Sequence, residues 1–324
     1  MRPDNRKIAL SIVAPAYNES VNLDMLYDRI TKVMADLDVD YHVIIIDDGS
    51  TDGTFNILKK IHQRDNRWKG IRLSRNYGHQ VAISAGLSEA TGDAVIILDS
   101  DLQDPPEVIS TFLDHWKSGY DVVYAIRKNR KENIFKRYCY KLFYKMLNAV
   151  SYIKIPMDAG DFSLIDHRVV KALNAMPEHN RFIRGLRAWV GFSQIGIPVE
   201  RDERHSGTPG YSLSKLVTLS ADGFFSFSWF PVRLLTMIGI TSVTLGFIYL
   251  TVVLYLRITY SIDIPGWTTL VFAVIGFGGA QLVGLGIIGE YVRRIFDEVR
   301  NRPQYLVDTT TDDPSSPNVH EVEH

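Results

Sequence analysis

Two kinds of segment alternate along roughly the first 125 residues of the chain. Short apolar runs rich in β-branched residues predict buried strands, and segments with apolar residues at three- and four-residue spacing predict amphipathic helices. The predicted strands are residues 8–14, 43–46, 70–73, 94–98 and 121–125. The predicted helices are residues 22–37, 54–63, 79–90 and 106–118. This alternation predicts an α/β fold with a mainly parallel sheet, which binds ligands beyond the carboxyl ends of its strands.

The pattern changes in the last third of the chain, where two long stretches, 234–256 and 267–289, contain no charged residue. Each is long enough to cross a hydrocarbon core of about 30 Å at a rise of about 1.5 Å per residue. A pair of buried core helices is the alternative, but a soluble core rarely uses two such runs in succession. We therefore predict transmembrane helices at residues 231–256 and 266–290.

Basic residues around these two helices indicate their orientation. Arg233 precedes the first helix, and Arg257 is the one basic residue between the two. The arginines that follow the second helix are Arg293, Arg294, Arg300 and Arg302. Basic residues are enriched on the cytoplasmic side of membrane proteins, so both termini are expected in the cytoplasm. The start of the chain shows no export signal, and the first domain is expected on the same side.

Composition adds three limits. The formal net charge of −1 gives no reason to expect a nucleic-acid partner. The single cysteine, Cys139, excludes an internal disulfide. Residues 303–324 end in an acidic stretch that contains Ser, Thr and Pro but few large apolar residues, and we predict a disordered tail there.

Polar motifs follow the first two predicted strands. The first strand runs into Ala-Pro-Ala-Tyr-Asn-Glu (14–19) and the second into Asp-Asp-Gly-Ser-Thr-Asp-Gly-Thr (47–54). The ring of Tyr17 can stack on a flat base, and a carboxylate in the second motif can accept a hydrogen bond from a uracil imide or a ribose hydroxyl. The alternative for the second motif is structural, since Asp, Gly and Ser are ordinary turn and helix-cap residues.

The fourth predicted strand leads into Asp-Ser-Asp-Leu-Gln-Asp (99–104), followed by Pro-Pro-Glu. Two carboxylates spaced i and i+2 after a buried strand can converge on one hard divalent cation. Mg²⁺ and Mn²⁺ prefer oxygen ligands, and substrate phosphates commonly complete their coordination. The alternative is a capping loop in which Asp104 starts the next helix and the other carboxylates are solvated.

Together these three motifs resemble the donor-site motifs of glycosyltransferase family 2. They are most similar to the polyprenyl-phosphate branch, which includes dolichol-phosphate mannose synthases and bactoprenol glucosyltransferases, and the similarity extends from residue 8 to about residue 302. The resemblance implies a GT-A catalytic domain at residues 1–210, a nucleotide-sugar donor and a divalent cation, Mg²⁺ or Mn²⁺. It implies that the nucleotide is held by Pro15, Tyr17, Glu19 and Asp48. It also implies that Asp99 contacts the donor and that Asp101 and Gln103 hold the metal.

The loop before the third predicted helix, residues 74–80, adds one candidate. Helix-start amides with Arg75 beside them suit a phosphate or a sugar hydroxyl, so we add Arg75 to the donor-binding residues. His79 lies in the same loop, but a histidine at a helix start is more often solvated or capping. We assign no role to His79 from the sequence.

Basic and aromatic residues interleave at 127–150, and a second basic stretch covers residues 201–215. Beside two membrane helices, the first stretch predicts an amphipathic helix in the headgroup layer, and a solvated basic helix is the alternative. The aromatic segment 211–230 predicts a second interfacial element.

Arginine suits a pair of phosphate oxygens. The candidates for the acceptor phosphate are Arg127, Arg201, Arg204 and Lys215, with Arg204 as the first choice.

Residues 155–164 resemble the family's stretch around the sugar and the acceptor, where an aspartate is usually assigned as the base. With Arg204, the catalytic candidates are therefore Asp158 and Asp161. A lipid monophosphate has a second pKa of about 6 and is largely a dianion at neutral pH, so it needs no base. Both roles stay open for the two aspartates, a general base or a positioning group for sugar hydroxyls, beside a purely structural turn and strand.

These features predict inverting transfer of a sugar from a nucleotide donor to polyprenyl phosphate at the cytoplasmic membrane face. Similarity favours UDP-glucose as donor and undecaprenyl phosphate as acceptor. One alternative is a processive polysaccharide synthase, but the Gln-x-x-Arg-Trp signature is replaced by Arg-Gly-Leu-Arg-Ala-Trp (184–189), and two membrane helices are too few for a polymer channel. The other is a catalytically silent membrane adaptor, which would not need both a metal set and an acceptor set.

Small residues recur every four positions in the second predicted membrane helix, at Gly276, Ala280 and Gly284. Such a face lets two helices approach closely. We expect it to pack either against the other helix of the pair or against a second subunit in a homo-oligomer.

Overall fold

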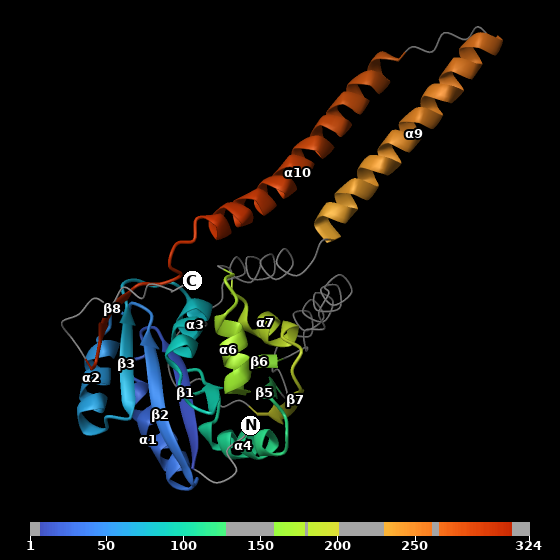
Figure 1. Ribbon diagram of the computed structural model, residues 1–324. Coiled ribbons are helices and arrows are strands. Elements are labelled where there is room, and N and C mark those ends of the chain that lie inside the picture. The colour runs from blue at the N-terminus through green and yellow to red at the C-terminus, as the bar shows by residue number, and fades with distance from the viewer. Residues whose placement is uncertain (1–6, 128–158, 179–180, 201–229, 261–265, 313–324) are drawn as a thin grey trace.

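The computed structural model describes residues 7–127, 159–178, 181–200, 230–260 and 266–312. An α/β domain occupies one end of the molecule, and two long helices extend from it (Figure 1). The strands are β1 Ile8–Ala16, β2 Val39–Asp47, β3 Trp68–Leu73, β4 Ala94–Ile97, β5 Val122–Arg127, β6 Ala159–Asp166, β7 Gln194–Val199 and β8 Val307–Thr310. The helices are α1 Leu23–Ala35, α2 Thr54–Arg64, α3 His79–Glu89, the short 3-10 helix η1 Pro106–Val108, α4 Ile109–Lys117, α6 His167–Asn174, α7 Ile183–Trp189, α9 Phe230–Tyr260 and α10 Trp267–Val299.

The described strands form one sheet in the order β7-β5-β6-β4-β1-β2-β3-β8. Strands β4, β1, β2 and β3 run parallel, and β5 pairs with β7 in parallel. Strand β6 is antiparallel to both of its neighbours, β4 and β5, and β8 is antiparallel to β3. Because β4, β1 and β2 are parallel and adjacent, the loops that follow them lie side by side at the carboxyl ends of these strands.

Helices cover both faces of this sheet. Apolar side chains of α1, α2 and α4 form one buried cluster with one face of the sheet, and those of α3, α6 and α7 form a second cluster on the other face. Within β1, Ile12 belongs to the first cluster and Val13 to the second, as the two-residue alternation of a strand requires. Helix α3 packs closely on β1, since a Cβ atom on Gly86 would lie 2.2 Å from Cγ1 of Val13. The predicted α/β fold with a mainly parallel sheet is confirmed.

The tail prediction is wrong for its first part. Residues 303–324 were expected to be disordered, whereas Val307–Thr310 forms β8 at the edge of the sheet beside β3 (Figure 1). Val307 is buried in the core, and the amide of Thr311 donates to the carbonyl of Gly70 at 2.9 Å. An edge strand needs mainly backbone partners, which composition does not reveal. Residues 313–324 lie outside the described residues.

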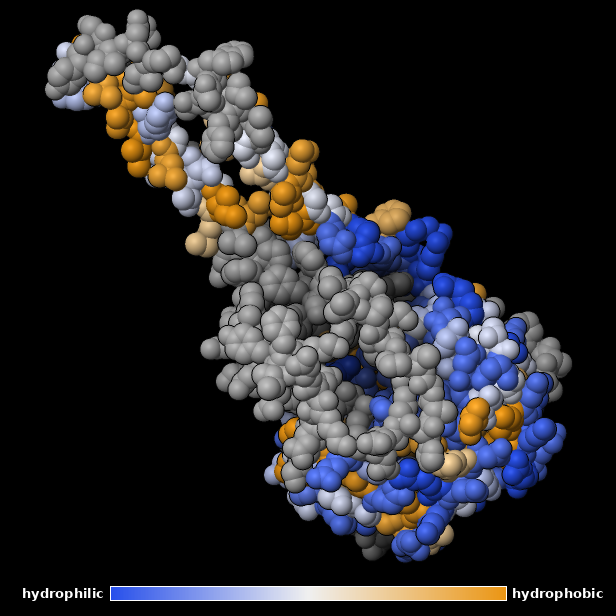
Figure 2. Space-filling view, turned by 180° about the vertical axis from the view of Figure 1, so that it is seen from behind, coloured by the Kyte–Doolittle hydropathy of each residue, from blue (hydrophilic) through white to orange (hydrophobic). Residues whose placement is uncertain are grey.

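The predicted apolar helix at 231–256 falls within α9, and the one at 266–290 falls within α10 except for Gly266, which is the N-cap. Among the described residues, one segment, Leu235–Leu256, is long and apolar enough to cross a membrane, with a mean hydropathy of 2.1 and none of its window buried. Membrane crossing by α10 stays a prediction. Figure 2 shows apolar residues along the two helices, in contrast to the largely polar surface of the domain.

Candidate functional site

Three loops meet at the carboxyl ends of β1, β2 and β4, where the sequence predicts the site. The amide of Asp48 donates to the carbonyl of Ala16 at 2.9 Å, which ties the loop after β2 to the end of β1. The hydroxyl of Ser100 donates to the carbonyl of Pro15 at 2.7 Å, which ties the loop after β4 to the same strand. The three motifs are therefore one structural unit.

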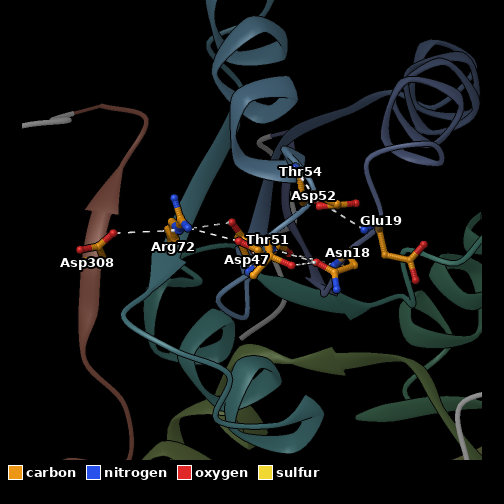
Figure 3. Close-up of polar contacts among 9 residues, drawn as sticks. Asn18, Glu19, Asp47, Thr51, Asp52, Thr54, Arg72 and Asp308 are labelled. Atoms are coloured by element: carbon orange, nitrogen blue, oxygen red, sulfur yellow. Dashed lines mark hydrogen bonds and ion pairs between the residues drawn. The ribbon is translucent and has the colours of Figure 1, made fainter.

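The loop after β1 is fastened to the loop after β2 by reciprocal hydrogen bonds (Figure 3). The amide of Asn18 donates to Oγ of Ser50, and the amide of Thr51 donates to Oδ1 of Asn18, both at 2.9 Å. Asn18 takes a left-handed backbone conformation with φ of 56°, which asparagine tolerates. The amide of Glu19 donates to Oγ1 of Thr54 at 3.0 Å. These bonds fix the backbone immediately after Tyr17.

Asp52 has a structural role at the start of α2. Its Oδ1 accepts from the amide and the hydroxyl of Thr54, and its Oδ2 accepts from the amide of Ser20 (Figure 3). Burial opposes ionisation, but the hydrogen bonds from Thr54 and Ser20 outweigh it and lower the pKa of Asp52 to about 2. Asp52 is thus a charged residue that joins the two loops just before α2.

Arg72 of β3 connects this unit with β8 (Figure 3). Its Nη2 donates to the carbonyl of Ser50 at 3.2 Å, and its Nε lies 3.8 Å from Oδ2 of the fully buried Asp47. The same Nε lies 4.0 Å from Oδ2 of Asp308 in β8. Burial raises the pKa of Asp47, although the bonds from Ser50 and the charge of Arg72 oppose that rise.

Asp48, predicted to hold the nucleotide, organises the loop before α3. Its two carboxylate oxygens accept from the amides of Tyr77 and Gly78 at 2.7 and 2.8 Å, and the residue is only 3% exposed. Burial raises the pKa of Asp48, and the two amide bonds act against that rise. Arg75 in this loop is exposed, with its guanidinium carbon 4.1 Å from the centre of the Tyr77 ring.

The other predicted nucleotide-binding residues lie around the same loops. Tyr17 is 48% exposed, so its ring is open to a ligand. Glu19 accepts a hydrogen bond from the side-chain amide of Asn22, and the carbonyl of Pro15 holds Ser100. The structure thus brings Pro15, Tyr17 and Glu19 together at one edge of the sheet.

Asp101 and Gln103, the predicted metal ligands, lie on one tight turn. The amide of Gln103 donates to Oδ1 of Asp101 at 3.1 Å. Between them, Leu102 has a φ of 61° and is buried, so it anchors the turn from inside. A carboxylate and a side-chain amide supply hard oxygen donors, which fit Mg²⁺ or Mn²⁺. In the described part of the chain no group of three His, Cys, Asp or Glu residues could hold a metal ion.

A charged cluster lies beside this turn, and we call it the Asp161 cluster: Asp161, His79, Gln80, Arg184 and Asp99. Nε of Arg184 lies 3.0 Å from Oδ1 of Asp161. Oδ2 of Asp161 accepts from the side-chain amide of Gln80 at 3.3 Å and lies 3.4 Å from Nε2 of His79. The same Nε2 lies 3.6 Å from Oδ1 of Asp99. The cluster joins β6, α3, α7 and the loop after β4.

Electrostatics keep Asp161 ionised. The carboxylate is almost fully buried, which opposes its charge, but Arg184, His79 and Arg187 together hold its pKa well below the usual range of an aspartate. Arg187 is 1% exposed, and its guanidinium carbon lies 4.8 Å from the centre of the Tyr124 ring. Burial lowers the pKa of Arg187 to about 10, which leaves it a cation at neutral pH.

The sequence did not single out His79, Gln80 or Arg184 for this site. His79 was interpreted as solvated or capping, and Arg184 was noted only within a synthase-like hexapeptide. Their partner Asp161 is more than 20 residues from Arg184 and 80 from His79 in the chain, so no local pattern links them. The position of His79 in the chain could have indicated a role, because it lies in the loop that follows a predicted strand, and ligands bind at such loops.

The remaining predicted site residues are not part of the loops and the cluster described above. Arg127 ends β5, where it pairs with Val199 of β7. Other predicted elements and residues lie outside the described residues: the helix after residue 127, the segment before residue 230, Asp158, Arg201, Arg204 and Lys215.

Comparisons with known proteins identify the family of the chain. The family model described as glycosyl transferase family 2 matches residues 11–173. An uncharacterized glycosyltransferase of Bacillus subtilis, YkcC, is 43% identical over 94% of this chain and 94% of its own length. The bactoprenol glucosyl transferase of Shigella phage SfII is 35% identical over 92% of this chain and 97% of its own length. A solved mannosyltransferase from Pyrobaculum calidifontis, in complex with GDP-Man and Mn²⁺, is 18% identical over 64% of this chain and 59% of its own, with a TM-score of 0.43. The family model and the two sequence relatives show that the chain belongs to glycosyl transferase family 2 and is a glycosyltransferase.

Proposed function

We propose that this glycosyltransferase transfers a sugar, with inversion at the anomeric carbon, from a nucleotide donor to polyprenyl phosphate at the cytoplasmic face of a membrane. The observation that carries the proposal is the match with the bactoprenol glucosyl transferase, which extends over 92% of the chain and so includes α9 and α10 as well as the donor-site loops. UDP-glucose and undecaprenyl phosphate are the substrates to test first.

The donor would bind across the three joined loops. Tyr17, whose ring is exposed, would stack on the base, and Asp99 and Arg75 would contact the sugar diphosphate. Asp101 and Gln103 would hold Mg²⁺ or Mn²⁺, which when bound offsets the negative charge that develops on the departing diphosphate. Pro15, Glu19 and Asp48 would shape the nucleotide pocket, Asp48 through its bonds to the loop before α3.

The acceptor phosphate would attack as a dianion. Asp161 accepts a hydrogen bond from Gln80 and faces the cations Arg184 and His79, an arrangement that favours the carboxylate and makes it a weak base. We therefore assign Asp161 a positioning role. Asp158 remains the aspartate for which both roles are open, and Arg127, Arg201, Arg204 and Lys215 are the proposed contacts of the acceptor phosphate.

Membrane attachment is part of the same proposal. The segment Leu235–Leu256 of α9 would cross the bilayer once, and α10 would return the chain to the same side. Both termini and the catalytic domain would then be cytoplasmic, with residues 127–150 and 211–230 at the headgroups.

The test uses the full chain in lipid nanodiscs with undecaprenyl phosphate, Mn²⁺ and a panel of radiolabelled nucleotide sugars. We expect label in the lipid extract with UDP-glucose, and a β-linked product by NMR, since the donor is α-linked. Asp101→Asn should lose this activity, whereas Asp114→Asn, on the exposed side of α4, should keep it. Label in a water-soluble polymer would favour a processive synthase, and no transfer from any donor would favour a silent adaptor.

A further inference from the structure

Asp99 and Asp161 belong to neighbouring segments of the domain, since Asp99 follows β4 by two residues and Asp161 lies in β6. Strands β4 and β6 pair Ala94 with Asp166 and continue, residue by residue, to Ile97 with Ser163. The pairing ends there, and Asp99 comes two residues after Ile97 while Asp161 comes two residues before Ser163. Two carboxylates held close together repel each other, and a cation between them offsets that repulsion.

His79 lies between these carboxylates. Its Nε2 is 3.6 Å from Oδ1 of Asp99 and 3.4 Å from Oδ2 of Asp161, and 35% of its side chain is exposed. Burial lowers the pKa of the imidazole and Arg184 opposes its charge, but Asp161 and Asp99 outweigh both and raise the pKa to about 9. His79 is thus a cation at neutral pH, and its Nε2 lies near both a carboxylate of β6 and a carboxylate of the loop after β4.

The backbone fixes where this imidazole can lie. His79 is the first residue of α3, and the preceding Gly78 has a φ of 100°, which L side chains rarely adopt. The amides of Tyr77 and Gly78 are held by Asp48. The backbone from which the imidazole extends is therefore held in place by the loop that Asp48 organises.

Asp161 has further contacts that do not depend on His79. Arg184 reaches its Oδ1 and Gln80 its Oδ2, and the carbonyl oxygen of the Gln80 side chain also accepts from the amide of Ile183 at 2.9 Å. The loss of His79 would leave Asp161 held from α3 and α7. Asp99, which lies on the loop after β4 with 20% of its side chain exposed, would lose its contact with the His79 cation.

We propose that His79 is a positioning residue of donor binding, which holds the Asp99 carboxylate in the orientation that meets the nucleotide sugar. The inference rests on the proposed function, because it takes Asp99 as a donor contact. His79 acts through Asp99, and no proton transfer is assigned to it. Its loss should therefore weaken donor binding and leave acceptor binding as it was.

The experiment compares His79→Gln and His79→Leu with the wild-type full chain. Glutamine keeps an N–H group near the place of Nε2 without the charge, and leucine removes both. Binding of UDP-glucose with Mn²⁺, measured by calorimetry, should weaken about threefold for His79→Gln and about tenfold for His79→Leu, in the range of one charge-assisted hydrogen bond. His62→Gln is the matched control, since Nε2 of His62 also lies 3.4 Å from an aspartate, Asp312, but at the far edge of the sheet.

Kinetics separate positioning from other roles. The donor KM should rise in parallel with the loss of binding, while kcat at saturating donor stays within about twofold and the KM for undecaprenyl phosphate is unchanged. Unchanged donor affinity in both variants would overturn the inference, and so would a loss of kcat at unchanged donor KM. If the leucine variant unfolds, the donor affinity and donor KM of the glutamine variant alone test the inference. Failure of the wild type to bind or use any donor of the panel would instead refute the proposed function, and with it this inference.

Discussion

Nε of Arg184 lies 3.0 Å from Oδ1 of Asp161, so a cation from α7 neutralises a carboxylate of β6 at the centre of the candidate site. Arg184, His79 and Arg187 hold the pKa of Asp161 well below its usual range against the opposing effect of burial. Because the folded-state pKa lies below the unfolded value, these contacts stabilise the fold at neutral pH, and their contribution is lost only as the pH falls through the lowered pKa.

The first prediction is that Asp161→Asn slows transfer without moving the acidic limb of the pH–rate profile. The limb should follow the second ionisation of the lipid phosphate, at about pH 6. The rate should fall about tenfold to a hundredfold because the amide disturbs the cluster geometry. Profiles from pH 5 to 8 at saturating donor and metal measure this. A mutant that loses the acidic limb while it binds both substrates normally would identify Asp161 as the base.

The second prediction concerns Asp48 and the loop before α3. Asp48→Ala leaves the buried amides of Tyr77 and Gly78 without their acceptors, which costs about 1–3 kcal/mol of folding free energy. Asp48→Asn keeps one acceptor oxygen and should lose less. Urea denaturation measures the difference, and the donor KM should rise in the same order. Equal stability of both variants and the wild type would show that the loop is held by other contacts.

The third prediction is that Asp101→Ala lowers transfer by at least about a hundredfold and removes the dependence on Mn²⁺ or Mg²⁺, with the fold intact. The carboxylate would hold the cation that bridges to the donor phosphates. Activity against metal concentration and circular dichroism of the same sample measure the two parts. Full activity with an unchanged metal dependence would refute the metal assignment.

The fourth prediction tests β8. Val307→Asp places a charge in the core beside β3 and should lower the free energy of unfolding by about 3 kcal/mol or more. Asp308→Ala, one residue further on, should change it by less than about 0.5 kcal/mol, since its contact with Arg72 is an exposed pair at 4.0 Å. Chemical denaturation of the two variants side by side measures this. Equal stability of both would show that β8 adds nothing to the domain.

The fifth prediction concerns the small-residue face of α10. A Cβ atom on the buried Gly284 would lie 3.1 Å from Cδ2 of Leu235, so this end of the face packs against α9. Ala280 is exposed. If a second subunit covers it, Ala280→Leu should lower the mass measured in detergent by light scattering. An unchanged mass and thermal stability would remove this face as an oligomer contact.

Local sequence patterns were enough to predict the central strands of the sheet and the loops that follow them. The apolar runs of β1, β2 and β4 end in polar motifs, and the parallel arrangement brings those motifs together, so Pro15, Tyr17, Asp48 and Asp101 could be placed at one edge in advance. Pairing between distant segments was beyond such patterns. Strand β6 comes after β5 in the chain but lies between β4 and β5 in the sheet, and only that placement brings Asp161 to His79 and Asp99.

The position of β8 changes how the whole chain is understood. The helices α9 and α10 lie between β7 and β8 in the sequence, and both of those strands belong to the same sheet (Figure 1). The helix pair is thus an insertion within the catalytic domain, and the domain is complete only after the chain has come back from the helices. A soluble version cut before residue 230 would leave the edge of β3 bare, whereas one that replaces the helix pair with a short flexible linker and keeps residues 304–312 would preserve the sheet.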